Sequence, residues 1–352
     1  MMRSYQFSQQ IQLGRRLIGP EQPSYIIAEA GVNHNGDMAM AHQLIDVAVA
    51  AGADAVKFQL FSTEALIRSD VVKASYQLQG EGDAQSQFQM LKQLEISPAQ
   101  CRQLQHYCAQ HGIEFLVTPF DEPSLEQLKE AKLSALKISS TDLTNLPFLV
   151  KAASLKIPLI VSTGMSEYSE VQRAVDTLYP HCKDLILLQC TSSYPAPDSA
   201  LNLRVMQSFQ QQFQLLVGYS DHTVGLGASP YAVAAGAVLV EKHFTLDKSL
   251  PGPDHQASLS PEELRQFVAE IRRVDAMLGS AVKSVEWCER ANRASLQKSM
   301  VAACRIEAGE PFTAQNLVAR RTGGIGVSPV YAEQLYRLCA TRNYDAGDII
   351  DG

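Results

Sequence analysis

Short apolar runs recur through the first 280 residues of the chain, and each is followed by a segment with the spacing of a helix. The eight runs cover residues 25–30, 53–61, 113–118, 135–140, 158–163, 185–190, 215–219 and 238–243. Apart from the second interval, successive runs begin roughly 20 to 30 residues apart, which is the spacing of repeated βα units. Eight such units close naturally into a barrel. The pattern therefore predicts an α/β fold, a (β/α)₈ TIM barrel, over residues 1–280.

Two stretches depart from this pattern. Residues 66–96, inside the long second interval, are polar and rich in glutamine, and we expect an extended loop over the barrel mouth there, because long insertions in compact domains are usually functional or disordered. After Gly279 the apolar runs become short and are separated by turn residues. We expect a linker with a helical piece at 281–297 and a small β-rich domain at 298–352, whose size is marginal for independent stability.

Composition and charge narrow the class of protein. Of the 352 residues, 46% are hydrophobic and 19% charged, as in ordinary globular proteins. The net charge of −7 argues against a nucleic acid or an anionic membrane as partner. No apolar run approaches the roughly 18 residues of a membrane span, and the N-terminus lacks the apolar core of a signal peptide. The seven cysteines are scattered without a CxxC pair, which favours reduced thiols and a cytoplasmic location.

Polar residues stand at the ends of the predicted strands. In a TIM barrel the catalytic groups come from the carboxyl ends of the strands. Nearly every run here ends in such residues, within the segments AEAGVNHNG, VKFQ, VTPFD, LKISS, VSTGM, LQCTSSYP, GYSDH and EKHF. Eight such endings in register are hard to explain by packing alone, so we expect an active site at this end of the barrel.

Two lysines and a series of hydroxyls in these endings suit a phosphorylated ligand. Lys57 and Gln59 alternate with apolar residues and so share one face of the second strand, and Lys137 lies within the fourth run. Hydroxyl groups occur in the later endings, at Ser139, Ser140, Ser162, Thr163, Thr191, Ser192, Ser193 and Ser220. Lysine charge and directed hydrogen bonds together hold a phosphate. The simpler alternatives are lysines that reach solvent and serines that cap turns.

Two histidines end neighbouring strands. His222 follows the seventh run and His243 closes the eighth. They could share one divalent metal, and imidazole, water and substrate oxygens suit Mn²⁺, Fe²⁺, Co²⁺ or Zn²⁺ better than Ca²⁺. The alternative is a hydrogen-bonded structural pair. Glu241, two residues before His243 on the same strand face, could be a ligand, a support for one, or a base.

Two other carboxylates and a turn complete the candidates. Glu29 ends the first strand in an apolar setting, where desolvation raises a carboxylate pKa and suits it to acid–base catalysis; alternatively it forms an ion pair with a barrel lysine. Residues 33–36 form a turn that could place donors at the mouth. Asp254 could bind sugar hydroxyls, or cap the helix that starts near Pro261.

Taken together, the segments IIAEAGVNHNGD, GADAVKFQ, TPFDE, LKISS, VSTGM, CTSSYPAP, GYSDHT and EKHFTLDKSLPGPDHQASL resemble the sialic acid synthase family over residues 24–280. The tail, with KSMVAACRIEAGEPF and ARRTGGIGVSP, resembles that family's C-terminal antifreeze-like (SAF) domain. The resemblance implies a metal-dependent enzyme that condenses phosphoenolpyruvate with N-acetylmannosamine and water to give N-acetylneuraminate, a nine-carbon 2-keto sugar acid, and phosphate. It also implies a domain-swapped homodimer.

The resemblance assigns roles by motif. It implies that phosphoenolpyruvate is bound by Lys57, Thr118, Lys137, Ser140, Ser162, Ser192 and Ser220. His222 and His243 would bind the metal, usually Mn²⁺, with Mg²⁺ or Co²⁺ as alternatives. The amino sugar would be contacted by Glu29, Gln59, Tyr194 and Asp254, and the catalytic candidates are Glu29, Lys57 and Lys137.

Two departures from the family pattern affect these roles. Arg321 resembles an arginine that the small domain inserts into the site of the other subunit, but the chain reads RTGGIG where the family has RPGNG. Arg320 is therefore an alternative. Ser192 stands where some members have asparagine, which affects one contact on the phosphate side.

Three other functions remain as alternatives. A legionaminate synthase of the same family would use a 2,4-diacetamido-trideoxy hexose in place of N-acetylmannosamine. A Schiff-base aldolase on the same barrel would use Lys57 or Lys137 as its nucleophile. A non-catalytic sugar-binding protein is suggested only by the antifreeze-like tail, and it does not need eight polar strand ends. The P-loop and nucleophile-elbow motifs are absent from the sequence.

Overall fold

The structure, a computed structural model, describes residues 5–73 and 86–351 of the chain. It divides into two compact units, with the boundary between Gly279 and Ser280. Each unit is described below by itself.

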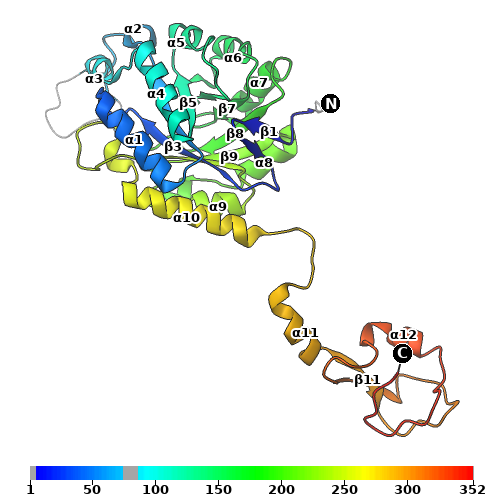
Figure 1. Cartoon of the computed structure of the whole chain (residues 1–352). Helices are drawn as coiled ribbons and strands as arrows, with labels where there is room; N and C mark the ends of the chain where they lie inside the picture. The colour runs from blue at the N-terminus through cyan, green and yellow to red at the C-terminus, as the bar shows by residue number, and fades with distance from the viewer. Residues whose placement is uncertain (1–4, 74–85, 352) are drawn as a thin grey trace. The chain divides into compact units, whose positions relative to one another are not determined.

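The first unit is built on a sheet of eight parallel strands (Figure 1). They are β3 (Tyr25–Gly31), β4 (Ala55–Leu60), β5 (Glu114–Pro119), β6 (Leu136–Ile138), β7 (Leu159–Ser162), β8 (Leu185–Cys190), β9 (Leu216–Asp221) and β10 (Leu239–His243). The last strand, β10, pairs with both β9 and the first strand β3, so the sheet curls back on itself. β5 and β6 lie next to each other but share no hydrogen-bonded ladder. The predicted (β/α)₈ barrel is confirmed, and each strand overlaps one of the eight predicted runs.

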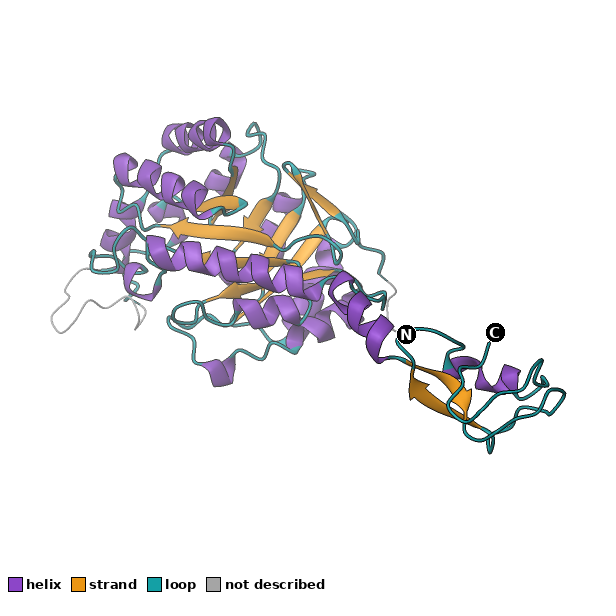
Figure 2. Ribbon diagram, turned by 60° about the horizontal axis from the view of Figure 1, so that its bottom comes forward, coloured by secondary structure: helices purple, strands orange, loops and turns teal. Residues whose placement is uncertain are grey.

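Helices follow the strands and cover the outside of the barrel (Figure 2). In chain order they are α1 (Met38–Ala51), α4 (Pro98–His111), α5 (Glu122–Gln127), α6 (Leu146–Ala153), α7 (Tyr168–Leu178), α8 (Val205–Phe213), α9 (Ser229–Ala234) and α10 (Pro261–Leu278). Local sequence sets their ends: α4 and α10 begin with a serine capping box followed by proline, at Ser97 and Ser260. Ser260, and not Asp254, therefore caps the helix that starts at Pro261. Short 3₁₀ turns lie at η2 (Ser140–Asp142), η3 (Asp198–Ala200) and η4 (His255–Ala257).

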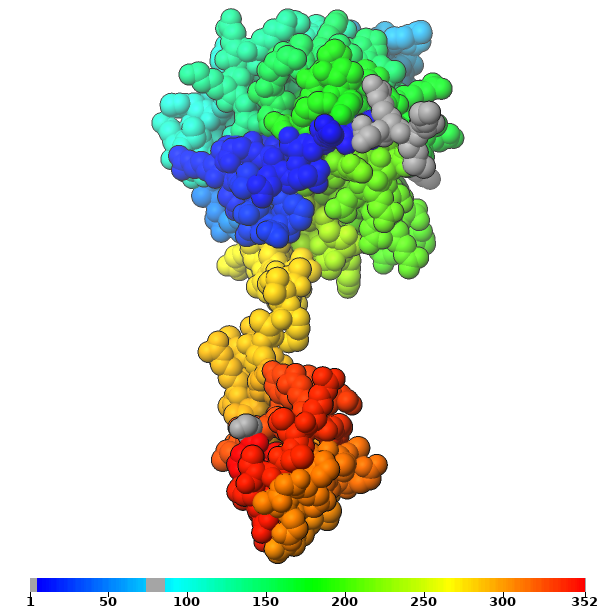
Figure 3. All heavy atoms as spheres, turned by 90° about the vertical axis from the view of Figure 1, so that its right-hand side faces the viewer, coloured from blue at the N-terminus to red at the C-terminus, as the bar shows by residue number. Residues whose placement is uncertain are grey.

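The inside of the barrel is apolar at one end and polar at the other. At the amino ends of the strands, side chains such as Ile27, Leu116 and Ile186 form a buried cluster. A hairpin of β1 (Ile11–Leu13) and β2 (Arg16–Ile18) adds its apolar residues to this cluster; the N-terminal part of the chain is dark blue in Figure 3. Because side chains alternate along a strand, the next inward positions lie near the carboxyl ends, and most of them are polar: Glu29 follows Ile27 and Thr118 follows Leu116, although Leu188 follows Ile186. The stability of the barrel and the chemistry of its mouth therefore depend on different layers of residues.

The predicted loop over residues 66–96 is only partly a loop. The structure places α2 (Thr63–Leu66) before it and α3 (Gln87–Leu94) within it; residues 74–85 lie outside the described part of the chain. Met90 and Leu94 of α3 are buried against Phe61 and Val32. The prediction missed α3 although its sequence carries helix signals, a capping box at Ser86 and the apolar residues Met90 and Leu94 four positions apart on one buried face.

The second unit carries a two-stranded antiparallel sheet of β11 (Lys298–Ala302) and β12 (Leu317–Arg321). It also contains η5 (Trp287–Glu289), α11 (Arg290–Leu296), η6 (Pro329–Tyr331) and α12 (Ala332–Leu335). Its own core is formed by Met300, Ile306, Phe312, Leu317 and Tyr344, together with a few neighbours. Within residues 5–73 and 86–351, no helix is long and apolar enough to cross a membrane.

Candidate active site

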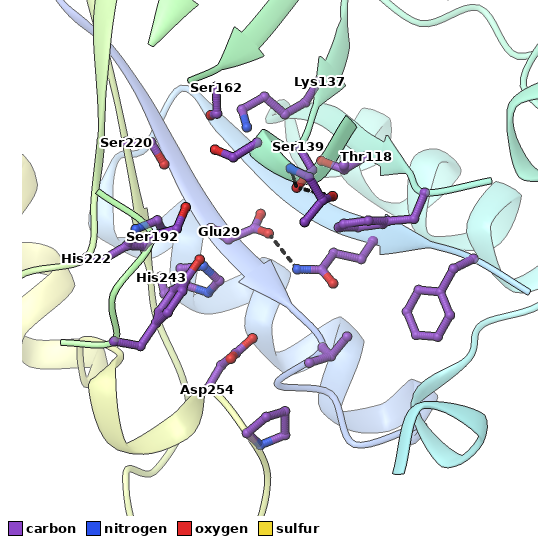
Figure 4. Close-up of a pocket in the computed structure, with 18 of the residues that line it drawn as sticks. Glu29, Thr118, Lys137, Ser139, Ser162, Ser192, Ser220, His222, His243 and Asp254 are labelled. Atoms are coloured by element: carbon purple, nitrogen blue, oxygen red, sulfur yellow. Dashed lines mark hydrogen bonds between the residues drawn. The ribbon is translucent and has the colours of Figure 1, made fainter. Parts of the chain in front are cut away.

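A cavity of about 430 Å³ opens at the carboxyl ends of the barrel strands. Every strand contributes to its lining, and so do the loops that follow several of them (Figure 4). The barrel residues to which the resemblance assigns a role all line it: Glu29, Lys57, Gln59, Thr118, Lys137, Ser140, Ser162, Ser192, Tyr194, Ser220, His222, His243 and Asp254. Three other hydroxyl residues of the strand endings, Thr163, Thr191 and Ser193, do not line it. The strand register brings distant positions side by side, with Glu29 between Lys57 on β4 and His243 on β10.

The two lysines are buried and paired with carboxylates. Lys57 Nζ lies 2.8 Å from Glu29 Oε1 and 3.7 Å from Glu241 Oε2, and it donates to Thr118 Oγ1 at 2.9 Å. Lys137 Nζ lies 3.4 Å from Glu241 Oε1. The lysine side chains are only 3% and 4% exposed, so neither reaches solvent. Glu241 therefore forms ion pairs with both buried lysines.

The two carboxylates differ in their affinity for protons. Burial raises the pKa of Glu29 to about 6, although the Lys57 charge opposes this. Burial acts on Glu241 in the same direction, but Lys137 and Lys57 outweigh it and lower the pKa of Glu241 to about 2. Glu29 forms the lysine ion pair that was the simpler alternative, and it still has the raised pKa of an acid–base group. Its second oxygen, Oε2, is buried and has no hydrogen-bond partner.

The hydroxyls divide into caps and cavity-facing groups. Ser139 accepts a hydrogen bond from the Thr141 amide, as a turn cap does. Ser140 Oγ accepts from the Gly164 amide at 2.9 Å, and Ser162 Oγ is buried without a hydrogen-bond partner. A Cβ on Gly164 would lie 2.2 Å from Ser192 Oγ and 2.9 Å from Ser140 Oγ. Glycine is thus required for the close approach of these hydroxyls, a role that the VSTGM segment did not suggest in advance.

The two histidines face each other across the mouth. Their ring centroids are 5.6 Å apart, and the Tyr194 ring lies 4.2 Å from that of His222. His222 Nδ1 donates to the Thr191 carbonyl at 3.0 Å, which leaves Nε2 with a free lone pair. His243 Nδ1 is buried without a hydrogen-bond partner, and burial lowers the pKa of His243 well below its usual value.

An imidazole binds a divalent metal in its neutral form, through a nitrogen that carries no proton. Burial favours that form for His243, whereas for His222 the neighbouring Cys190 and the Thr191 carbonyl outweigh burial and raise its pKa above the usual value. Within the described residues, no group of three or more His, Cys, Asp or Glu side chains is arranged to hold an ion. A metal at this position would therefore depend on the two histidines, with water and substrate oxygens as its other ligands.

The loop that carries Asp254 is held by residues that the sequence analysis assigned differently. Asn33 is buried and does not line the cavity; its Nδ2 donates to Ser258 Oγ at 3.0 Å. His255 contacts Asn35 Oδ1 at 3.1 Å. The 33–36 turn thus anchors this loop instead of offering donors at the mouth. Burial raises the pKa of Asp254 to about 6.

One wall of the cavity is apolar, and it was not predicted from the sequence. It consists of Phe61, Leu66, Ile67, Met90, Leu91 and Phe120, which we call the apolar wall. Phe61 and Phe120 directly follow β4 and β5. Leu66 ends α2 and Ile67 follows it, and Met90 and Leu91 belong to α3. Cys190 was also missed: its thiol lies 3.7 Å from both His222 Nδ1 and Ser140 Oγ.

Arg320 and Arg321 lie on β12 of the second unit, and both are exposed. The strand pairing places Arg321 opposite Lys298 and Arg320 opposite Ser299.

Comparison with known proteins agrees with the fold and the cavity. The chain is 43% identical to the N,N'-diacetyllegionaminic acid synthase of Campylobacter jejuni, over 92% of this chain and 98% of that protein. It is 42% identical to the enzyme of the same name from Legionella pneumophila, over 94% of each chain. The crystal structure of N-acetylneuraminic acid (sialic acid) synthetase from Leptospira borgpetersenii matches with a TM-score of 0.73 at 35% identity, covering 83% of this chain and 99% of that one.

These relatives are synthases of legionaminic and sialic acids, so the resemblance noted in the sequence is confirmed. The NeuB family profile matches residues 44–283. The chain belongs to the NeuB family.

Proposed function

We propose that the protein is a legionaminate-type synthase, which condenses phosphoenolpyruvate with a 2,4-diacetamido-trideoxy hexose and water to give a nine-carbon 2-keto sugar acid and phosphate. The relatives with 43% and 42% identity, both named N,N'-diacetyllegionaminic acid synthases, support this sugar. They favour it over N-acetylmannosamine, which the sequence analysis had placed first.

The observation that carries this choice is the apolar wall. The sixth carbon of a trideoxy hexose is a methyl group, whereas N-acetylmannosamine has a hydroxymethyl group there. The carbon is common to both groups, so the difference lies in the hydroxyl, and burying a hydroxyl without a partner costs about 1–3 kcal/mol. Against the apolar wall this cost favours the deoxy sugar by about 2 kcal/mol, roughly 30-fold.

Phosphoenolpyruvate fits the lysines and hydroxyls of the strand ends. Lys57 and Lys137 supply positive charge, and the hydroxyls of Thr118, Ser140, Ser162, Ser192 and Ser220 supply directed hydrogen bonds. Ser162 Oγ and Glu29 Oε2 are, with Glu241 Oε2, buried polar atoms of these strand ends that lack hydrogen-bond partners, so they are open to a substrate. Fixing the enol ester in this way contributes mainly orientation and charge stabilisation.

The proposed reaction first joins the two substrates and then releases phosphate. The methylene carbon of phosphoenolpyruvate attacks the aldehyde carbon of the open-chain sugar, and the carbon bearing the phosphate becomes electron-deficient. Water adds to that carbon and gives one proton to Glu29 Oε2, which returns it to the former aldehyde oxygen. The carbon–oxygen bond to phosphate breaks, the remaining hydroxyl loses its proton, and the 2-keto group forms. A divalent metal, Mn²⁺ in first place and otherwise Mg²⁺ or Co²⁺, held by His222 and His243, would polarise the aldehyde oxygen as a Lewis acid.

The second unit contributes Arg321 in this proposal. Arginine presents several donors in a fixed geometry and suits the carbonyl oxygen of an N-acetyl group. We propose that Arg321, rather than its neighbour Arg320, completes the sugar site of the other subunit in a domain-swapped homodimer.

The decisive experiment measures phosphate release from phosphoenolpyruvate and Mn²⁺ with each sugar in turn. We expect kcat/KM to be roughly 10-fold or more higher for the 2,4-diacetamido-trideoxy hexose than for N-acetylmannosamine. A preference for N-acetylmannosamine would contradict the choice of sugar, and no phosphate release with either sugar would contradict the synthase. Borohydride trapping of a lysine with pyruvate, together with activity that survives a chelator, would instead support a Schiff-base aldolase.

A further inference from the structure

A buried ion pair lies directly behind the two histidines. Lys242 Nζ is 3.0 Å from Asp221 Oδ1, with side-chain exposures of 2% and 0%. The two residues face each other across the β9–β10 ladder. Asp221 immediately precedes His222, and Lys242 immediately precedes His243.

Strand alternation separates the two pairs onto opposite faces. Glu241 and His243 line the cavity, so Lys242 between them projects away from it. Ser220 and His222 line the cavity in the same way, with Asp221 between them. The ion pair therefore touches no substrate, but it joins the two chain segments that carry the histidines.

The pair also fixes the turn after β9. Asp221 accepts hydrogen bonds from the amides of Thr223, Ala228 and Ser229 and from the hydroxyls of Thr223 and Ser229. Lys242 donates to the Thr223 carbonyl at 2.8 Å. Residues on both sides of His222 are thereby tied to the strand that ends in His243.

The turn closes tightly over this cluster. Gly227 has a φ of +62°, and a Cβ there would lie 2.8 Å from both Asp221 Oδ2 and Lys242 Nζ. Burying two charges is costly, but Asp221 also accepts from three buried backbone amides, which an apolar side chain would leave without a partner. The ion pair in addition holds the two strands in one register and at one separation.

We propose that the Asp221–Lys242 pair is a positioning device that sets the separation of the His222 and His243 imidazoles, and with it the affinity for the divalent metal. This inference rests on the metal site of the proposed function. A metal with only two protein ligands is especially sensitive to their spacing, because no third side chain compensates for a displaced one.

The test is a Mn²⁺ titration of the metal-stripped full chain, followed by the electron paramagnetic resonance signal of free Mn²⁺. The variants are Lys242→Met, the double variant Asp221→Asn/Lys242→Met, and His222→Ala. The matched control is Asp54→Asn, at the amino end of β4. Like Asp221, Asp54 is a buried carboxylate that accepts from a backbone amide and pairs with cations, but it lies far from the cavity lining.

We expect Lys242→Met and the double variant to bind Mn²⁺ roughly 10- to 100-fold more weakly, the usual effect of removing a group that orients a metal ligand. Asp54→Asn should lower the melting temperature and leave Mn²⁺ affinity within about 2-fold. If Lys242→Met does not fold, the double variant decides, because it leaves no uncompensated buried charge.

Two results would overturn the inference while leaving the metal site standing. One is wild-type affinity in the Lys242 variants when His222→Ala has lost binding. The other is an equal loss in Asp54→Asn, which would indicate general loosening. No Mn²⁺ binding by the wild-type chain, or undiminished binding by His222→Ala, would overturn the metal site itself and this inference with it.

Discussion

Replacing Lys137 with methionine should separate the function of this lysine from the stability of the barrel. The Lys137 ammonium lies 3.4 Å from Glu241 Oε1 and donates to the Ile138 carbonyl at 3.3 Å. Burial lowers the pKa of Lys137 below its usual 10.5. A lysine whose pKa is lowered by folding destabilises the fold at neutral pH, and this penalty disappears only above the unfolded pKa of about 10.5.

The expected change in stability is therefore small. Removing one partner of a buried pair usually costs about 3–5 kcal/mol, because the other charge is left uncompensated. Here Glu241 keeps Lys57 at 3.7 Å and the Ser220 hydroxyl at 3.1 Å. Methionine also removes the cost of burying the ammonium, so we expect the free energy of unfolding to change by no more than about 1 kcal/mol, roughly 2–4 °C in Tm.

The expected change in activity is large. A charge-assisted hydrogen bond to the phosphate or carboxylate of phosphoenolpyruvate contributes about 1.5–3 kcal/mol, so kcat/KM for this substrate should fall roughly 10- to 150-fold. Steady-state phosphate release at varied phosphoenolpyruvate measures this, and thermal unfolding of the same preparation measures stability. The control is Lys151→Met, which removes an exposed lysine paired with Glu122 on the outside of the barrel. Unchanged kcat/KM, or a Tm lower by more than about 10 °C, would refute the reasoning.

Three further predictions follow from the site. His243→Ala should abolish turnover and Mn²⁺ binding while circular dichroism shows an intact fold; full activity would remove this histidine from the metal site. The pKa values of Glu29 and Asp254 are both about 6, so kcat/KM should fall with a slope approaching two as the pH drops through about 6. In Asp254→Asn we expect a slope of one, and an unchanged pH profile would contradict this assignment. Arg321→Ala should raise KM for the amino sugar roughly 10- to 150-fold, while Arg320→Ala changes it little. At an amino-sugar concentration below the raised KM, mixing the Arg321→Ala and His243→Ala proteins should give more activity than the sum of the two alone if each site is shared between subunits, and no gain would exclude the domain swap.

The barrel was predictable because its information is local and periodic. Each strand is a short apolar run, and the alternation of side chains fixes which residues face the mouth, so Lys57, Gln59 and Lys137 were placed correctly. The repeat of polar strand ends identified the cavity before any contact was known.

Most features that were not predicted depend on contacts between residues distant in the sequence. Glu241 was left open between metal ligand, support and base, because only the folded barrel shows that its neighbours are Lys57 and Lys137. The contact between Asn35 and His255 spans 220 residues, so nothing in the local NHNG turn indicated it. α3 is an exception: its capping box at Ser86 and its apolar positions Met90 and Leu94 are local signals, within a glutamine-rich segment for which we expected a loop.

The missing ladder between β5 and β6 has a consequence for how substrate and scaffold act on each other. Thr118 ends β5 and Lys137 lies in the middle of β6, so two groups that we assign to phosphoenolpyruvate stand on either side of this seam. An anion bound by both residues would connect two strands that share no backbone hydrogen bonds with each other. In the free protein, amide hydrogens of β5 and β6 along this seam should therefore exchange faster than those of the other barrel strands. Their exchange should slow when phosphoenolpyruvate binds, because the substrate then links the two strands.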